Sequence, residues 1–198
     1  MTSFDSMYRD ATPPWDIGRP QGAFVPLAEA GALRGSVLDV GCGTGEHALL
    51  AAGLGLSATG VDSAPTAIAR AEDKARARGL DARFVVGDAL TLDGVGGPFD
   101  TVLDCGLFHV FDDAERTRFA AALHAVTAVG GRYFLLCFSD RQPGDWGPRR
   151  VTQGEIRACF ADGWRVDEIV PAVIEVLPFN DHGEEWAVES WLATITRR

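Results

Sequence analysis

The sequence predicts an α/β fold built on a doubly wound, mostly parallel sheet of seven strands whose last strand is antiparallel. Strand-like and helix-like segments alternate through most of the chain, and a glycine-rich turn directly follows the first strand. Alternation of this kind places helices on both faces of a parallel sheet. The last two strand-like segments have no helix between them, so we expect an antiparallel hairpin at one edge of the sheet.

Seven segments are predicted as strands, and most of them are short and apolar. The fifth, residues 132–138, is apolar nearly throughout, as expected of a strand that is buried on both faces. An extension of the sixth strand to residue 176 stays open. The predicted strands are residues 37–40, 57–61, 82–86, 99–104, 132–138, 164–170 and 186–196.

Four segments are predicted as helices, and each carries a start or stop signal. Gly79 closes the second, which is amphipathic and rich in alanine and arginine. Asp112 is the expected N-cap of the third, which Gly130 and Gly131 end, and Thr152 opens the fourth. The predicted helices are residues 46–54, 64–78, 112–129 and 155–160.

The chain is expected to form one compact domain in which two parts are distinguished. Residues 1–34 form an N-terminal lid and a first helix, and residues 35–198 form the sheet domain. Trp15 and Trp146 lie in two loop segments, residues 1–24 and residues 140–150. Both loops are expected to fold over the carboxyl end of the sheet, where ligands bind in such folds.

Charge and composition exclude several classes of protein. Lysine and arginine number 18 against 28 aspartates and glutamates, a net charge of −10 that repels nucleic acids and anionic membrane surfaces. No apolar run approaches the roughly 20 residues needed to span a bilayer, and no signal peptide is visible. A cytoplasmic protein is therefore expected. The four cysteines and four histidines show no metal-ligand spacing, so no metal site is predicted.

The first strand runs into the glycine-rich turn that carries most of the functional information. Residues 37–45 read Val-Leu-Asp-Val-Gly-Cys-Gly-Thr-Gly, and Gly41 and Gly43 leave room for a ligand against bare backbone. Asp39 stands two residues before the first glycine, where a carboxylate suits a cation or a hydroxyl and discourages a pyrophosphate. The third glycine of the dinucleotide fingerprint would fall at position 46, which is Glu46. A nicotinamide-dependent oxidoreductase is therefore disfavoured.

Acidic residues recur at the ends of the next strands. Asp62 is placed to hold the two hydroxyls of a ribose, and Asp88 is placed to accept a hydrogen bond from an adenine amino group. Asp104 and Cys105 follow the fourth strand, where the methionine part of a ligand is expected. Such an acidic site suits a nucleoside that carries positive charge and no phosphate. S-adenosyl-L-methionine fits this description.

With these features the chain resembles the class I S-adenosylmethionine-dependent methyltransferases over roughly residues 35–198. The resemblance implies a Rossmann-like fold, S-adenosyl-L-methionine as cofactor and S-adenosyl-L-homocysteine as product. The expected cofactor-binding residues are Trp15, Asp39, Gly41, Gly43, Asp62, Ser63, Asp88, Ala89, Asp104 and Cys105.

A finer resemblance concerns two loops. Residues 14–20, Pro-Trp-Asp-Ile-Gly-Arg-Pro, look like the entry segment of the thiopurine and thiol/halide methyltransferases, in which the residue matching Trp15 lines the cofactor pocket. Residues 147–152 are similar to the loop after the fifth strand in the same group. The chain departs from that group because it is short and lacks a second upstream tryptophan.

Methyl transfer requires alignment of the acceptor and exclusion of water, because the methyl group is already activated. Thiolates and aromatic nitrogens need no strong base, whereas a phenol does. His109, just past the fourth strand, is the candidate catalytic residue, either as proton acceptor or as a group that orients the acceptor. We favour a thiol or a heteroaromatic nitrogen as acceptor. The alternative is O-methylation of a phenol-type molecule with His109 as base.

Aromatic residues near the expected acceptor site predict a small, aromatic or apolar acceptor. An arginine could hold an anionic acceptor. No basic or groove-forming segment points to a protein or a nucleic acid as the acceptor. The oligomeric state stays open between a monomer and a homodimer. The expected acceptor-binding residues are Phe24, Phe108, Trp146 and Arg149, with Phe179 as a further candidate. A non-catalytic module that binds the cofactor is an alternative from another class. An aminopropyl transferase is disfavoured by the aromatic loops.

Overall fold

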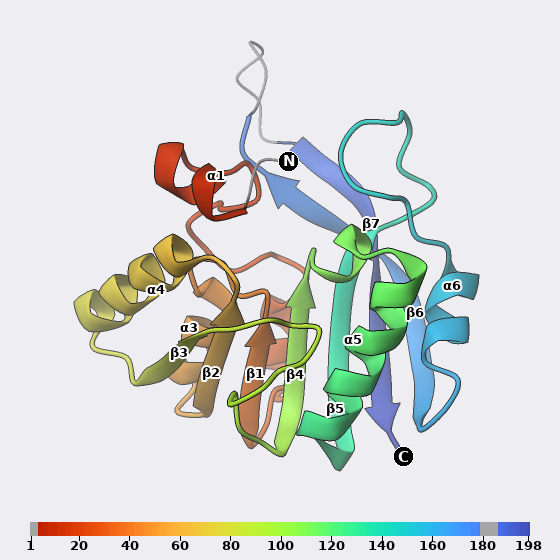
Figure 1. The fold of residues 1–198 in the computed structure, drawn as a ribbon, viewed down its shortest axis with the longest axis horizontal. Helices are drawn as coiled ribbons and strands as arrows, with labels where there is room; N and C mark the ends of the chain where they lie inside the picture. Colours follow the sequence, from red (N-terminus) through yellow and green to blue (C-terminus); the bar gives the residue numbers. More distant parts are fainter. Residues whose placement is uncertain (1–3, 179–185) are drawn as a thin grey trace.

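The computed structural model describes the backbone of residues 4–178 and 186–198, which form a seven-stranded sheet (Figure 1). The strand order β3-β2-β1-β4-β5-β7-β6 reverses direction next to β1, as in a doubly wound fold. The strands are β1 Ser36–Val40, β2 Ser57–Asp62, β3 Ala82–Val86, β4 Phe99–Cys105, β5 Thr127–Phe138, β6 Trp164–Val176 and β7 Trp186–Arg197.

Strands β1 to β5 are mutually parallel, and β7 runs antiparallel to both of its neighbours, β5 and β6. This arrangement confirms the predicted mostly parallel sheet with an antiparallel last strand. The terminal hairpin of β6 and β7 lies at one edge of the sheet, with β7 next to β5 and β6 outermost. Strand β6 runs on to Val176, the extension that the sequence left open.

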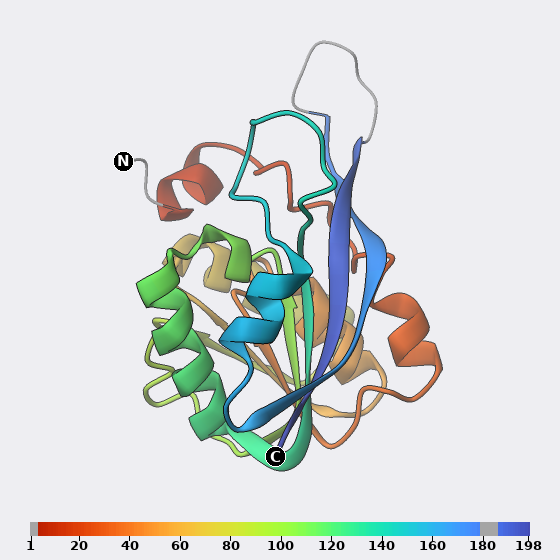
Figure 2. The ribbon, with the colours of Figure 1, turned by 90° about the vertical axis from the view of Figure 1, so that its right-hand side faces the viewer.

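Helices cover both faces of the sheet. Figure 2 shows α2 and α3 on one side and α5 and α6 on the other. The helices are α1 Phe4–Asp10, α2 Val25–Glu29, α3 Glu46–Gly53, α4 Pro65–Arg78, α5 Asp113–Val126 and α6 Gln153–Cys159, and a 3-10 turn, η1, spans Phe108–Val110. None of the described helices combines the length and the apolar character that crossing a bilayer would require.

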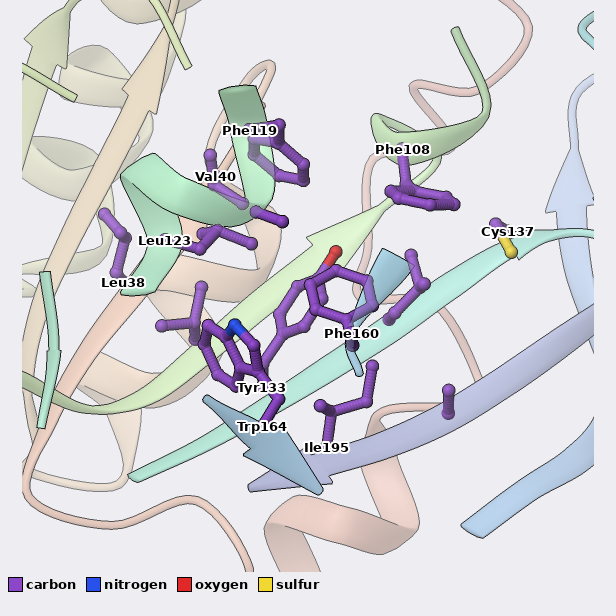
Figure 3. Packing of buried hydrophobic residues seen from close by; sticks show 14 of the residues in the cluster. Leu38, Val40, Phe108, Phe119, Leu123, Tyr133, Cys137, Phe160, Trp164 and Ile195 are labelled. Carbon is purple, nitrogen blue, oxygen red and sulfur yellow. The ribbon is translucent and has the colours of Figure 1, made fainter. Parts of the chain in front are cut away.

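Each face of the sheet has its own buried cluster. Side chains of α5 and the end of α6 pack on β5 and β4, and Figure 3 shows Phe119 and Leu123 directed toward Tyr133 and Phe160. The cluster on the opposite face joins α2 and α3 to the sheet through small and aromatic residues, among them Phe24. Burial of apolar surface on both faces explains why β5 is apolar over most of its length.

The third predicted helix is three residues too long. Helix α5 ends at Val126, and the backbone is already extended from Thr127, which pairs with Phe99 of β4. The Thr127 hydroxyl donates to the Leu123 carbonyl at 2.7 Å, a carbonyl in the last turn of α5, and this bond helps to end the helix there. The predicted caps are confirmed, because Asp112 and Thr152 each form a capping box at the start of α5 and α6.

The N-terminal segment crosses the carboxyl ends of the strands (Figure 1). It begins with a helix, α1, in a stretch that was expected to be a loop. The Asp5 carboxylate accepts a hydrogen bond of 2.8 Å from the Thr66 amide at the start of α4, and Arg70 donates to the Tyr8 carbonyl. Further along, the Leu177 amide donates to the Pro14 carbonyl at 2.7 Å. One segment is therefore attached to α4 on one flank of the sheet and to the end of β6 on the other.

Candidate active site

A cavity of about 660 Å³ lies at the carboxyl ends of the parallel strands, bordered by the N-terminal segment and the loop of residues 140–150. Small-molecule sites typically occupy roughly 300–1,000 Å³. We call the part lined by α1 and the turns after β1, β2 and β3 the loop half. The part lined by β6, the end of β5 and the 140–150 loop is the β6 half. Because β4 lies between β1 and β5, the turn after β4 falls between the two halves.

The turn after β1 exposes its backbone to the loop half of the cavity, because its glycines have no side chains. The Gly43 amide donates to the Asp62 carboxylate at 2.8 Å, and the Cys42 amide donates to the Val61 carbonyl at 2.9 Å, so β2 holds the turn. Gly43 and Gly45 have φ values of +51° and +85°. A Cβ on Gly43 would lie 2.6 Å from the Tyr8 hydroxyl. Only glycine allows the turn and its cover to pack this closely.

The acidic residues after β2 and β3 also line the loop half, together with Ser63 and Ala89. The Asp62 carboxylate accepts hydrogen bonds from Gly43 and, at 2.9 Å, from the Ala64 amide. Burial raises the pKa of Asp62 above its ordinary value, and the backbone donors oppose that rise. Asp88 is exposed and accepts from the Leu90 amide at 2.8 Å. Both carboxylates keep acceptor capacity for a ligand.

Trp15 lines the cavity together with residues of α1. Its indole N–H donates to the Tyr8 hydroxyl at 2.9 Å, and Tyr8 is buried against the glycine turn. The Thr44 hydroxyl donates to Asp16 at 2.7 Å and accepts from Lys74 at 2.6 Å. These contacts hold the N-terminal segment over the loop half and limit the access of water.

Two of the predicted cofactor contacts lie behind the wall of the cavity, and Asp39 is the first. Its Oδ2 accepts from the Ala48 amide of α3 at 3.0 Å, and its buried Oδ1 has no hydrogen-bond partner among the described residues. Burial raises the pKa of Asp39 to about 7, against the effect of the Ala48 donor. The side chain connects β1 to α3 and does not line the cavity.

Asp104 is the second predicted cofactor contact that lies behind the cavity wall. Its side chain holds the turn after β4 from the side of the protein core. Its carboxylate accepts from the Leu107 amide at 2.9 Å and from the Tyr133 hydroxyl at 2.8 Å. Cys105, the next residue, does line the cavity. Asp104 therefore shapes the turn that leads to His109 instead of facing a ligand.

Stability at different pH values tests the burial of Asp104. Burial raises its pKa to about 7, against roughly 3.9 in an unfolded chain, so the folded state holds a proton that the unfolded state releases. This contribution to stability is complete below about pH 4 and is lost as the pH rises toward 7. We expect Asp104→Asn, which stays neutral, to gain stability relative to the wild type between about pH 4.5 and 8, by a few kcal/mol at most. Urea unfolding at both pH values measures the gain.

The exposed Asp93 provides the control for this experiment. Asp93→Asn is expected to leave the pH dependence of stability unchanged. A difference between Asp104→Asn and the wild type that stays constant over the pH range would show that Asp104 is ionised in the folded protein throughout.

His109 lies in η1 and lines the cavity. Its Nδ1 accepts a hydrogen bond of 3.0 Å from the Phe138 amide of β5, and its ring packs edge-on against the Phe138 ring at 4.7 Å. Burial, together with the nearby charges of Arg116 and Arg150, lowers the pKa of His109 to about 3. The imidazole is therefore neutral at physiological pH.

Apolar side chains dominate the β6 half. Ile174 and Val176 project from alternate positions of β6, and Trp146 packs edge-on against Phe138 at 6.0 Å between ring centroids. Arg150 lies over the Trp146 ring and donates to the Trp146 carbonyl at 2.9 Å. The 140–150 loop is thus held by hydrogen bonds from an arginine, and its tryptophan faces the cavity as predicted.

Three residues predicted to bind the acceptor do not line the cavity. Phe24 is fully buried against the His47 ring, and Phe108 points back into the core under α5 and α6. Arg149 lies on the surface, where it pairs with Asp113 and Glu155. The direction of each side chain is set by packing between distant elements, which local sequence does not reveal. Phe179 lies outside the described residues.

Several cavity residues escaped the sequence reasoning. Phe4, Met7 and Tyr8 line the cavity from α1, and their i, i+3, i+4 spacing is the signal of a short amphipathic helix. Ile174 and Val176 show the alternation of a strand that buries one face. Both signals were present in the sequence, although each was short.

The sheet order, the glycine turn and the acidic strand ends around one cavity define the class of S-adenosylmethionine-dependent methyltransferases. Residues 37–131 match the family described as "Methyltransferase domain". The chain is 38% identical over 179 residues to 2-heptyl-1-hydroxyquinolin-4(1H)-one methyltransferase of Mycobacteroides abscessus, covering 85% of this chain and 79% of that relative. The chain belongs to the class I S-adenosylmethionine-dependent methyltransferases, and S-adenosylmethionine is its methyl donor.

Two further comparisons extend this result. A solved structure from work on the conversion of a disulfide bond into a thioacetal group during echinomycin biosynthesis matches with a TM-score of 0.90 and 41% identity, covering 98% of this chain and 91% of that chain. Probable thiol methyltransferase 2 of Arabidopsis thaliana is 28% identical over 145 residues, covering 72% of this chain and 64% of the relative.

Proposed function

We propose that this enzyme transfers the methyl group of S-adenosylmethionine to a small, largely apolar acceptor, at sulfur or at a heteroaromatic ring nitrogen. The observation that carries the proposal is a single cavity that joins the glycine turn and its acids to an apolar, aromatic chamber. An anion such as a pyrophosphate would meet the carboxylates of Asp62 and Asp88, whereas a cationic nucleoside would be attracted by them.

The residues of the loop half fit the cofactor in the following way. Asp62 would accept from the ribose hydroxyls, Asp88 from the adenine amino group, and Ser63 and Ala89 would flank the adenine. Gly41, Gly43, Cys105 and Trp15 would surround the methionine part. When bound, the cofactor supplies a methyl group on a positively charged sulfur. The residues around it align the acceptor and keep water out.

Among the described residues that line the β6 half and the turn after β4, none is a suitable base, which favours acceptors that are nucleophilic without one. His109 would be the base for a phenol, but its Nδ1 is occupied by the Phe138 amide and its pKa lies near 3. A group with such a pKa accepts a proton poorly at neutral pH. O-methylation of a phenol with His109 as base is therefore the less favoured alternative.

Two of the comparisons support sulfur, and a third adds a further candidate. The thiol methyltransferase and the structure connected with a disulfide conversion both concern sulfur. The Mycobacteroides relative is named for a flat heteroaromatic compound with an apolar tail and a ring-borne hydroxyl. A hydroxyl attached to ring nitrogen is acidic and needs little help from a base, so it is our second candidate acceptor.

Titration calorimetry and a methylation screen test the proposal. We expect both S-adenosylmethionine and S-adenosylhomocysteine to bind, and mass spectrometry should detect methylated products from thiols, N-heteroaromatics or N-hydroxy heteroaromatics. Failure of both cofactor forms to bind would reject the proposal. Cofactor binding without turnover of any acceptor class would favour a non-catalytic binding module, and turnover confined to phenols would favour the alternative.

A further inference from the structure

The hydrogen bond between His109 and β5 fixes which ring nitrogen carries the proton. A backbone amide is always a donor, so the Nδ1 that accepts from Phe138 at 3.0 Å has no proton. In the neutral ring the proton must then lie on Nε2. Nε2 has no hydrogen-bond partner in the described chain and is not among its fully enclosed polar atoms, so it faces the cavity that His109 lines.

Other polar side chains of the described cavity wall near β6 are already engaged. The amide of Gln21 bonds to the backbone of Glu175 at both of its ends, at 2.9 and 2.8 Å. Arg19 donates twice to the Glu175 carboxylate, and the His47 ring accepts from the backbone N–H of Gln21 at 3.1 Å. His109 thus offers a ligand an N–H group for which the described residues provide no competing acceptor.

Two arginines lie near His109 behind the cavity wall, and Arg116 pairs with Glu155 at 3.2 Å. Arg116 approaches from α5 and Arg150 from the 140–150 loop, and both disfavour the imidazolium form. Asp104, the acidic residue of the same turn, is bound by backbone amides and by Tyr133 on the inner side. The loop half, in contrast, is lined by Asp62 and Asp88. The loop half therefore favours a cation. At His109 the cavity offers a hydrogen-bond donor, and such a donor binds an anion more strongly than a neutral acceptor.

We propose that His109 is a fixed hydrogen-bond donor that holds the acceptor as an anion through Nε2–H, and that the enzyme selects thiolates and acidic ring hydroxylates over neutral ring nitrogens. This inference rests on the proposed function. The acceptor loses its proton to solvent before it binds. Its lone pair then forms a bond to the methyl carbon, the carbon–sulfur bond breaks, and the electron pair of that bond returns to sulfur. The two opposite charges cancel, and the protein moves no proton.

The first test needs no acceptor. Nitrogen-15 NMR of the free protein, labelled at histidine, reports the protonation of each ring nitrogen. We expect His109 to carry its proton on Nε2 alone and to stay in this form from about pH 5 to 8. A proton on Nδ1, or titration of His109 within this range, overturns the inference.

The second test separates binding of an anion from binding of a neutral molecule. Thiophenol, largely ionised at about pH 8, and quinoline, which is neutral there, are titrated into the protein loaded with S-adenosylhomocysteine. A hydrogen bond to a charged group contributes roughly 1.5–3 kcal/mol, or about 10- to 150-fold in affinity. His109→Phe should weaken thiophenolate binding by at least about tenfold and should weaken quinoline binding clearly less, because the quinoline nitrogen accepts only a neutral hydrogen bond. His109→Gln, whose side chain can accept from Phe138 and donate to the cavity, should restore most of the affinity.

The outcomes distinguish this inference from the proposed function. If S-adenosylhomocysteine fails to bind the wild type, the proposed function fails. Only the inference fails if S-adenosylhomocysteine binds equally to the wild type and both variants, but thiophenolate binds no better to the wild type than to His109→Phe. The same holds if thiophenolate binds to neither protein. A pH profile of kcat/KM that follows the ionisation of each acceptor, with no change contributed by His109, is the expected kinetic result.

Discussion

Replacing Asp62 with alanine is expected to weaken binding of S-adenosylhomocysteine by about 100-fold or more. The carboxylate accepts from the Gly43 and Ala64 amides, so its loss removes one of the two hydrogen bonds that hold the glycine turn to β2. The proposed bonds to the ribose hydroxyls are lost as well. Charge-assisted hydrogen bonds contribute roughly 1.5–3 kcal/mol each, and about 1.4 kcal/mol corresponds to a tenfold change in affinity.

Calorimetric titration measures this loss, and thermal unfolding checks that the variant is folded. Asp93→Ala serves as control, because Asp93 is exposed and does not line the cavity. The control should bind as the wild type does. An Asp62→Ala protein that is folded and binds within about fivefold of the wild type would remove Asp62 from the cofactor site.

Replacing Phe119 with alanine is expected to lower the free energy of unfolding by about 3–5 kcal/mol. Phe119 is fully buried on α5 and contacts the rings of Phe108, Phe111 and Tyr133 (Figure 3). The cavity left behind would lie directly under η1, because Phe108 begins that turn. The loss should therefore reach His109 and reduce activity as well as stability.

Urea unfolding measures the change, with Arg118→Ala on the exposed side of the same helix as control. Surface substitutions of this kind usually change stability by less than about 0.5 kcal/mol. A loss below about 1.5 kcal/mol for Phe119→Ala would mean that the surrounding side chains collapse into the space.

The parts of the fold that local patterns control could be predicted from the sequence. The seven strands and the caps at Asp112 and Thr152 follow from periodicity and from side-chain hydrogen bonds within a few residues. The end of α5 was predicted too late because Gly130 is a strong stop signal. Pairing of Thr127 with Phe99, far away in the sequence, sets the actual boundary.

In the candidate site, too, some residues could be predicted from the sequence and others could not. Residues directly after β1, β2 and β3 line the cavity because strand ends converge there in any parallel sheet, so Gly41, Gly43, Asp62 and Asp88 were placed by topology alone. The acceptor residues were harder to predict. Phe108 and Arg149 lie in the expected loops, but packing against α5 and α6 turns their side chains away from the cavity.

The position of β6 at the edge of the sheet has a consequence for how the enzyme can diversify. Ile174 and Val176 line the part of the cavity where we propose that the acceptor binds, yet their strand pairs on one side only, with β7. The glycine turn and Asp62 belong to strands at the opposite end of the order. Substitutions at Ile174 and Val176 can therefore reshape the acceptor chamber while the machinery that recognises the methyl donor stays intact. If the proposed division of the cavity holds, substrate preference is separable from cofactor recognition, and directed evolution of a new preference would begin at these two positions.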